Sequence, residues 1–204
     1  MSESGQDQEK QTIVPNLFPL RKESVLAAFR DLSPAENPSV AQEAVNEEMR
    51  IFRETNPYVF NYFADFAQDM RNRKVAEELI DQVSWGVMVG HRALREEAKF
   101  KGGVLPTFTS EFIEDYHRKD VERISAMSYE KITVQQAAIQ LGNLELVKFE
   151  RWEPESRKIV REKLGLQSDW RPEQDGRYLG IIDLYLLFKE GCSDPKNFQN
   201  KSVD

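Results

Sequence analysis

Cysteine and histidine are scarce in this chain, with one and two copies respectively. The single cysteine, Cys192, cannot form an internal disulfide and stands outside any redox or metal-ligand spacing. The opening segment "MSESGQDQEKQ" also lacks the basic-then-apolar order of a secretory signal. We therefore expect a cytoplasmic protein that folds without disulfide bonds.

Long apolar runs and catalytic fingerprints are missing as well. The apolar run "VSWGVMVG" is flanked by "EELIDQ" and "RALREE" and is far shorter than the roughly 18 residues of a membrane span. The segment "KGGV" lacks the lysine-serine ending of a phosphate-binding loop, and no serine elbow or zinc-ligand cluster occurs. We expect no membrane span, no cofactor and no metal.

Basic residues are also fewer than acidic residues. Lys and Arg number 28 against 35 Asp and Glu, which gives a net charge of −7 and a pI near 5.1. This balance opposes nonspecific attraction to nucleic acid or anionic lipid, although a local basic patch can still bind. A hydrophobic content of 40% in 204 residues is enough for the core of one domain.

Proline, asparagine and glycine divide the chain into segments with helical periodicity. Asparagine-proline pairs occur at 37–38 and 56–57. The asparagine side chain can accept a hydrogen bond from a free backbone amide at a helix start, and the proline ring fixes φ at a value that suits the first helical turn. The residue before Pro34 is pushed out of the helical region, and Gly165 and Gly191 are stop signals. The pattern predicts helices over 22–33, 38–55, 57–70, 74–100, 110–126, 133–141, 144–152, 153–165 and 177–191.

These segments predict an all-α protein, built as a single helical bundle with a smaller C-terminal helical extension. We place the bundle core at 22–126 and an extension that packs on it at 127–191. Residues 1–21 and 192–204 are poor in core formers, and we expect both to be mobile tails.

Two glycines lie on the apolar stripe of the 74–100 segment. Gly86 and Gly90 share this stripe with Leu79, Val83 and Leu94. A glycine inside a helix costs about 1 kcal/mol relative to alanine, so two in adjacent turns need a compensating reason. We expect them to allow another backbone or a large ring to approach closely.

Trp85 and Met88 project from the opposite side, so the middle of this helix is apolar nearly all round. Such a helix is either central in the bundle or covered on one face by another chain. We favour the central position, because one domain of this size can bury one helix completely. If a partner covers it, Trp85, Met88, Gly86 and Gly90 are the interaction residues.

Three polar groups are candidates for chemistry. His91 lies at the edge of the stripe; we expect a hydrogen bond to a neighbouring helix rather than a proton-transfer or metal role. Glu114 and His117 have the i, i+3 spacing of di-iron bundles, but no second copy occurs. Asp183 stands alone in "LGIIDLYLLF", and we expect it to pair with an arginine or lysine of another helix, with proton transfer as the alternative.

The segment "ITVQQAAIQLGNLELVKFERW" has features of a helix-turn-helix. Ala138 precedes Gly142 by four residues, and apolar residues follow that would seat a second helix. The spacing fits the common pattern only if Asn143 is an extra residue in the turn.

This segment resembles the helix-turn-helix of excisionase-like and MerR-like DNA-binding proteins over about 20 residues, one tenth of the chain. The resemblance implies a second helix that enters the major groove. The alternative is a plain helical hairpin. The basic residues that would contact DNA are Lys148, Arg151, Arg157, Lys158, Arg161 and Lys163.

The chain has apolar helices and an excess of acidic residues, and its sequence shows no catalytic site. These features favour a non-enzymatic interaction or structural protein, whose partner is another protein or a second copy of itself. The first alternative is a DNA-binding regulator that uses residues 133–163. The second is an enzyme whose site is assembled from residues distant in sequence.

Overall fold

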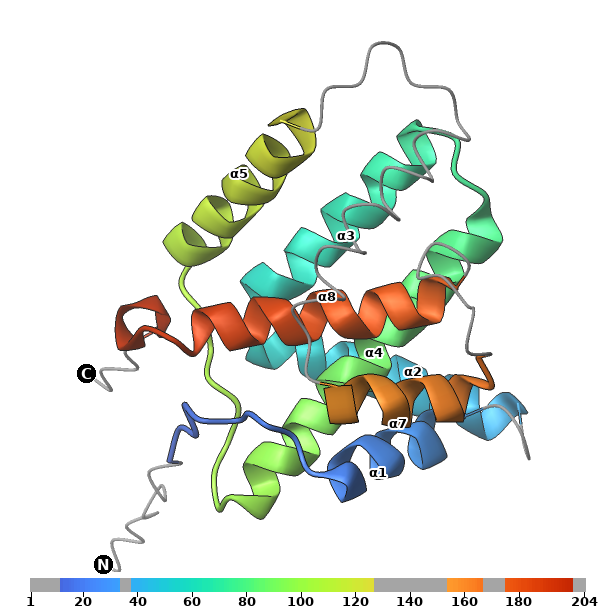
Figure 1. Ribbon diagram of the computed structural model, residues 1–204, viewed down its shortest axis with the longest axis vertical. Coiled ribbons are helices and arrows are strands. Elements are labelled where there is room, and N and C mark those ends of the chain that lie inside the picture. The colour runs from blue at the N-terminus through green and yellow to red at the C-terminus, as the bar shows by residue number, and fades with distance from the viewer. Residues whose placement is uncertain (1–11, 34–37, 127–153, 167–174, 200–204) are drawn as a thin grey trace, which may run out of the picture.

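The computed structural model describes residues 12–33, 38–126, 154–166 and 175–199 (Figure 1). These ranges contain α-helices and one short 3-10 helix, and within them no β-strand forms beyond two isolated bridges. The prediction of an all-α fold is confirmed. The elements are α1 (Lys22–Leu32), α2 (Pro38–Thr55), α3 (Pro57–Asn72), α4 (Glu77–Phe100), α5 (Ser110–Ala126), α7 (Pro154–Leu164), α8 (Gly176–Gly191) and η2 (Pro195–Asn197).

Most described helices begin and end where the local sequence signals predict. α1 ends at Leu32, shortly before Pro34, and α3 begins at Pro57, whose fixed φ suits the first turn. α7 ends before Gly165, which has φ 67° and thus adopts the left-handed conformation that closes many helices. The predicted helices at 133–141 and 144–152, with the helix-turn-helix resemblance, lie outside the described residues.

Asn56 differs from its predicted role at the start of α3. It is the N-cap residue, but its side chain accepts no hydrogen bond from the helix. Instead it is buried, and neither side-chain polar atom has a partner among the described residues. Its backbone joins the two helices, since Asn56 N–H donates to Phe52 O and its carbonyl accepts from Phe60 N–H, each at 2.9 Å. The proline that follows has a fixed φ that suits the first turn of α3.

α4 is the central helix, in contact with α1, α2, α3 and α8. α8 crosses it closely (Figure 1) because both helices carry glycine at the contact. A methyl group added to Gly86 would overlap the Arg177 carbonyl oxygen, and one added to Gly180 would overlap the Val83 carbonyl oxygen. The prediction that the glycine stripe admits a close backbone is confirmed.

The opposite side of α4 is covered by α1. The Trp85 ring packs on Phe29 with centroids 5.9 Å apart, and its Nε1–H donates to the Leu32 carbonyl oxygen at 3.1 Å. Met88 is buried. Of the two explanations for an all-round apolar helix, the structure confirms the central position within one chain.

The core extends into the segment that the sequence assigns to an amino-terminal tail. Val14, Leu17 and Leu20 are buried, and Leu17 is fully so. Backbone pairing fixes this segment, because Val14 N–H donates to Val104 O at 3.0 Å and Val104 N–H donates to Thr12 O at 2.9 Å. The expected tail therefore extends too far along the chain. Its apolar residues lie three apart, but Pro15 and Pro19 interrupt the segment, so no helix is predicted there.

At the other end, α8, the last helix of the segment assigned to the extension, lies in the core. Almost all of its 16 residues are buried, including Tyr178, Tyr185 and Phe188. The chain then turns back through η2, where Phe198 is half-buried and Gln199 N–H donates to Thr107 O at 2.8 Å. Neither α8 nor any other helix in the described ranges has the length and apolar character required to cross a bilayer.

Candidate functional site

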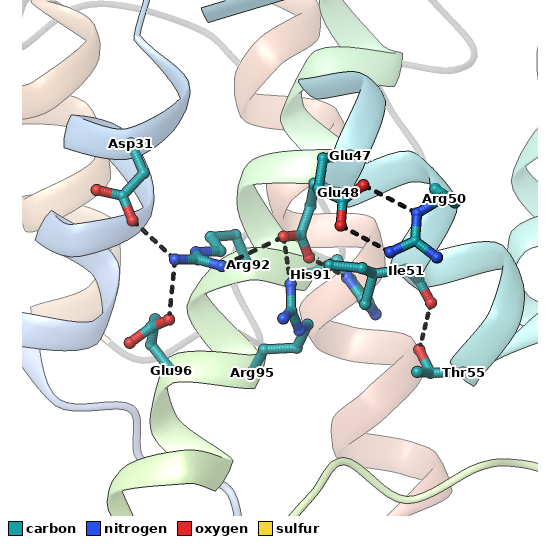
Figure 2. A network of polar contacts seen from close by, with 10 residues as sticks. All are labelled: Asp31, Glu47, Glu48, Arg50, Ile51, Thr55, His91, Arg92, Arg95 and Glu96. Atoms are coloured by element: carbon teal, nitrogen blue, oxygen red, sulfur yellow. Dashed lines mark hydrogen bonds and ion pairs between the residues drawn. The ribbon is translucent and has the colours of Figure 1, made fainter. Parts of the chain in front are cut away.

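Buried and partly buried polar side chains join α4 to α1 and α2 and form the candidate site. The first group, which we call the Glu48 network, consists of Asp31, Glu48, His91, Arg92, Arg95 and Glu96 (Figure 2). The second group surrounds Glu97, one turn further along α4. Both groups bring together residues that lie far apart in sequence.

Glu48 is the centre of its network. It lies on the buried stripe of α2, seven residues after Ala41 and four before Phe52, so helical spacing directs it at α4. Its Oε1 lies 2.5 Å from His91 Nδ1, and its Oε2 accepts from Arg95 Nη1 at 2.5 Å (Figure 2). A carboxylate with only 3% of its side chain exposed is thus compensated by two donors.

His91 is fully buried. Its ring stacks on Phe52 with centroids 4.1 Å apart and planes at 22°. The hydrogen bond to a neighbouring helix is confirmed, but the expected position at the edge of the stripe is not, because α2 covers this side of α4. His91 Nε2 has no hydrogen-bond partner among the described residues. Burial lowers the pKa of His91, and the opposing effect of Glu48 does not outweigh it.

Arg92 extends the Glu48 network to α1. Its Nη2 lies 2.9 Å from Asp31 Oδ2 and 3.2 Å from Glu96 Oε1, and its Nη1 lies 3.7 Å from Glu48 Oε2 (Figure 2). One guanidinium therefore joins carboxylates of three helices, a use for which its several N–H groups are suited. About a quarter of the Arg92 side chain remains exposed, at 26%.

Glu97 supports the start of α1 from α4. Arg21, the N-cap residue, makes no side-chain cap of its own. Instead, its backbone N–H donates to Glu97 Oε2 at 3.2 Å, and Ser24 Oγ donates to the same oxygen at 2.6 Å. Burial alone would raise the pKa of Glu97, but the hydrogen bonds from Ser24 and Arg21 and the charges of Arg21 and Lys101 lower it.

The geometry of His91 and Glu48 resembles an oriented acid-base pair, yet both side chains are buried against other helices. A general base must reach a substrate proton directly or through one water. This arrangement therefore suits helix-helix fixation better than turnover. Glu114 and His117 are exposed on α5, and within the described ranges no group of three His, Cys, Asp or Glu is arranged to hold a metal.

The four interaction residues predicted on α4 make their contacts inside the chain. Gly86 and Gly90 face α8, Trp85 is half-buried against α1, and Met88 is buried. An exposed apolar surface at Trp85 and Met88, which the alternative of a covering partner would require, is not found there. Their apolar character is used to cover the central helix of the bundle.

Asp183 is buried on α8 and is not isolated, since it has an interaction within the fold. The predicted pairing with an arginine or lysine remains a prediction. Cys192 is half-buried after α8, and burial raises the pKa of its thiol to about 12. A thiol in this state is a weak nucleophile at neutral pH.

The basic residues of the DNA-binding alternative are only partly described. Lys148 and Arg151 lie outside the described residues. Arg157 and Arg161 are half-buried on α7 and take part in interactions within the fold, whereas Lys158 and Lys163 are exposed.

Glu48 and Glu97 were not predicted as site residues from the sequence. Both look like ordinary members of charged stretches, "NEEMR" and "REEAKF". The available signal is positional: each acid falls on the buried stripe of its helix. That signal becomes specific only when the donors from other helices are known.

An aromatic side chain is left exposed at the carboxyl end of α4. Phe100 is 63% exposed, the largest value among the large hydrophobic residues described. The Arg21 guanidinium lies over its ring, 3.2 Å from the centroid. Ile13, which pairs with Val104 just beyond this helix, is also exposed at 36%.

No protein-family model, curated protein or solved structure matches this chain.

Proposed function

We propose that this chain is a non-enzymatic helical protein that acts by binding another protein, either a second copy of itself or a different chain. The observation that carries the proposal is the exposed Phe100 with Arg21 stacked on its ring. Aromatic residues and arginine are enriched at protein interfaces, where they supply much of the binding energy. The buried Glu48 network supports the non-enzymatic part, because its ionisable groups are used to join helices.

Site-specific crosslinking tests this proposal. A photoreactive amino acid is placed at position 100 and, as a matched control, at position 58, because Tyr58 is another exposed aromatic residue, 39% exposed at the start of α3. We expect position 100 to crosslink to one defined protein in the native lysate, identified by mass spectrometry, and position 58 not to do so. Equal crosslinking from both positions would contradict the proposal.

The partner is then purified and its affinity measured directly. We expect Phe100→Ser to weaken binding at least tenfold, about 1.4 kcal/mol, and Tyr58→Ser to leave it unchanged. Sedimentation equilibrium of the chain alone distinguishes self-association from binding to a different protein. A partner whose affinity is the same for both variants would place the contact elsewhere.

A DNA-binding regulator is the second candidate, favoured only by the exposed Lys158 and Lys163 on α7. It predicts binding to duplex DNA with affinity that falls steeply as salt rises. Fluorescence anisotropy with labelled duplex at several salt concentrations tests it. Replacement of both lysines by glutamate should abolish binding if this candidate is correct.

A further inference from the structure

We propose that His91 makes the contact between α2 and α4 sensitive to acid: neutral His91 holds α2 in place, and protonation of its ring weakens that contact. This inference goes beyond the proposed binding function and does not depend on it. The geometry around the two ring nitrogens carries the argument.

The two nitrogens of His91 have opposite environments. Nδ1 lies 2.5 Å from Glu48 Oε1, and the other oxygen of this carboxyl group accepts from Arg95 Nη1, so we place the hydrogen of the neutral ring on Nδ1. Nε2 is therefore the nitrogen that would take up a second proton. It is buried and has no hydrogen-bond partner among the described residues. A proton there would create a buried donor without an acceptor, which is costly.

The surrounding charges do not remove this cost. α2 contributes Glu48, which favours the protonated ring, but α4 contributes Arg92 and Arg95, which oppose it and already share the Glu48 carboxylate. α1 contributes Asp31, which is paired with Arg92 instead of His91. Phe52 of α2 covers the face of the His91 ring, and Phe60 of α3 packs on Phe52. At Gly90, the residue before His91, α8 approaches α4 through Leu184 and Tyr185.

The sign of the pH effect follows from the direction of the shift. Burial lowers the pKa of His91 in the folded chain below the ordinary value of about 6.5 that applies when the chain unfolds. The stabilisation is therefore fully present above about pH 6.5 and is lost as the pH falls toward the folded pKa, because the unfolded state binds the additional proton. Over this range, one proton lowers the folding equilibrium constant by up to tenfold per pH unit.

The two histidines of the chain provide a matched pair of variants. His91→Asn keeps an N–H donor near the position of Nδ1 but cannot be protonated, and His117→Asn removes the exposed histidine on α5. Unfolding by denaturant is measured for the wild type and both variants between pH 7.5 and 5. We expect the wild type and His117→Asn to lose stability with the same slope as the pH falls. The slope of His91→Asn should be smaller by close to one proton.

The proposal is overturned if His91→Asn and the wild type have the same slope. If His91→Asn does not fold, nuclear magnetic resonance of the imidazole nitrogens in the wild type decides instead. We expect neutral His91 with its hydrogen on Nδ1 at pH 7 and at pH 6. A ring that carries both protons at pH 7, or its single hydrogen on Nε2, would contradict the proposal.

Hydrogen exchange locates the weakened contact. Exchange is followed at pH 7 and pH 5.5 and corrected for the intrinsic effect of pH on amide exchange. We expect amides of α2 to lose protection at the lower pH by a larger factor than amides of α8, which packs on the glycine face of α4. Equal losses in α2 and α8 would show that acid weakens the fold as a whole, and would overturn the specific role of this contact.

Discussion

The two sides of α4 are held by opposite kinds of contact. Toward α8, the contact depends on missing side chains, because Gly86 and Gly180 let the two backbones meet. Toward α1 and α2, aromatic contacts of Trp85 and His91 are joined by charged side chains that meet around Glu48 and Arg92. One helix therefore combines close backbone packing toward α8 with a network of charged side chains toward α1 and α2.

This difference determines how each interface responds to substitutions and to pH. Close backbone packing tolerates no added atom, but a contact between two backbones does not itself change charge with pH. A buried ionic network accepts small changes of shape but depends on every partner and on its protonation state. Substitutions on the two sides of α4 should therefore differ in both the size and the pH dependence of their effects.

The largest effect should come from the glycine side. Gly86→Ala places a methyl group on the Arg177 carbonyl oxygen, and neither backbone can move without displacing its helix. We expect a loss of about 3 kcal/mol in the free energy of unfolding, measured by denaturant titration, because overpacking against backbone cannot be relieved by a rotamer change.

Gly90→Ala is the matched control on the same stripe. Its methyl group would lie 3.0 Å from Leu184 Cδ2, the end of a flexible side chain that can move slightly. The helix propensity of alanine, about 1 kcal/mol better than glycine, offsets this adjustment, so we expect a change within about 1 kcal/mol. Similar losses for the two variants would show that the crossing at Gly86 is not the tight point of the interface.

The next largest effect should come from the polar side. Glu48→Leu leaves His91 Nδ1 and the guanidinium of Arg95 without their acceptor. Arg95 is 27% exposed and can recover some hydration, so we expect a loss of about 2 kcal/mol, below the range for a fully buried ion pair. The measurement is again denaturant unfolding at pH 7.

Glu47→Leu removes a neighbouring acid whose hydrogen bonds come from Arg50 of the same helix. Glu47 is 55% exposed and lies 2.7 Å from Arg50. Exposed pairs of this kind contribute little, so we expect a change below about 0.5 kcal/mol. If Glu47→Leu were as damaging as Glu48→Leu, the loss could not be assigned to the buried network.

The contrast between the two sides also explains what the sequence could predict. Helix positions followed from local signals, and the close approach at Gly86 followed from spacing along one helix. The Glu48 network did not follow, because its donors lie 43 and 47 residues away at His91 and Arg95. An acid on a charged helix acquires a partner only when the helices pack, and periodicity within one segment does not contain that information.

The loss of stability in acid tests the role of the second polar group, which surrounds Glu97. The pKa of Glu97 is lowered below 4.5, so its contribution is present above that value and is lost as the pH falls through the folded pKa. Glu97→Gln should cost about 1 kcal/mol at pH 7, since Ser24 still finds an oxygen acceptor while the charge is removed. We expect the stabilities of this variant and the wild type to converge as the pH falls through the lowered pKa of Glu97, as followed by circular dichroism. A difference that persists there would show that shape, and not charge, makes Glu97 important.

The smallest effect should come from the end of α4, where neither kind of contact operates. Phe100 is 63% exposed, and its interaction with Arg21 belongs to the weak class of exposed cation-π pairs. Phe100→Ser should therefore lower the free energy of unfolding by only about 0.5 kcal/mol. Denaturant unfolding of this variant is also the control for the binding experiments. A loss above about 1.5 kcal/mol would show that the ring stabilises the fold, and weaker binding by Phe100→Ser would then not identify a surface contact.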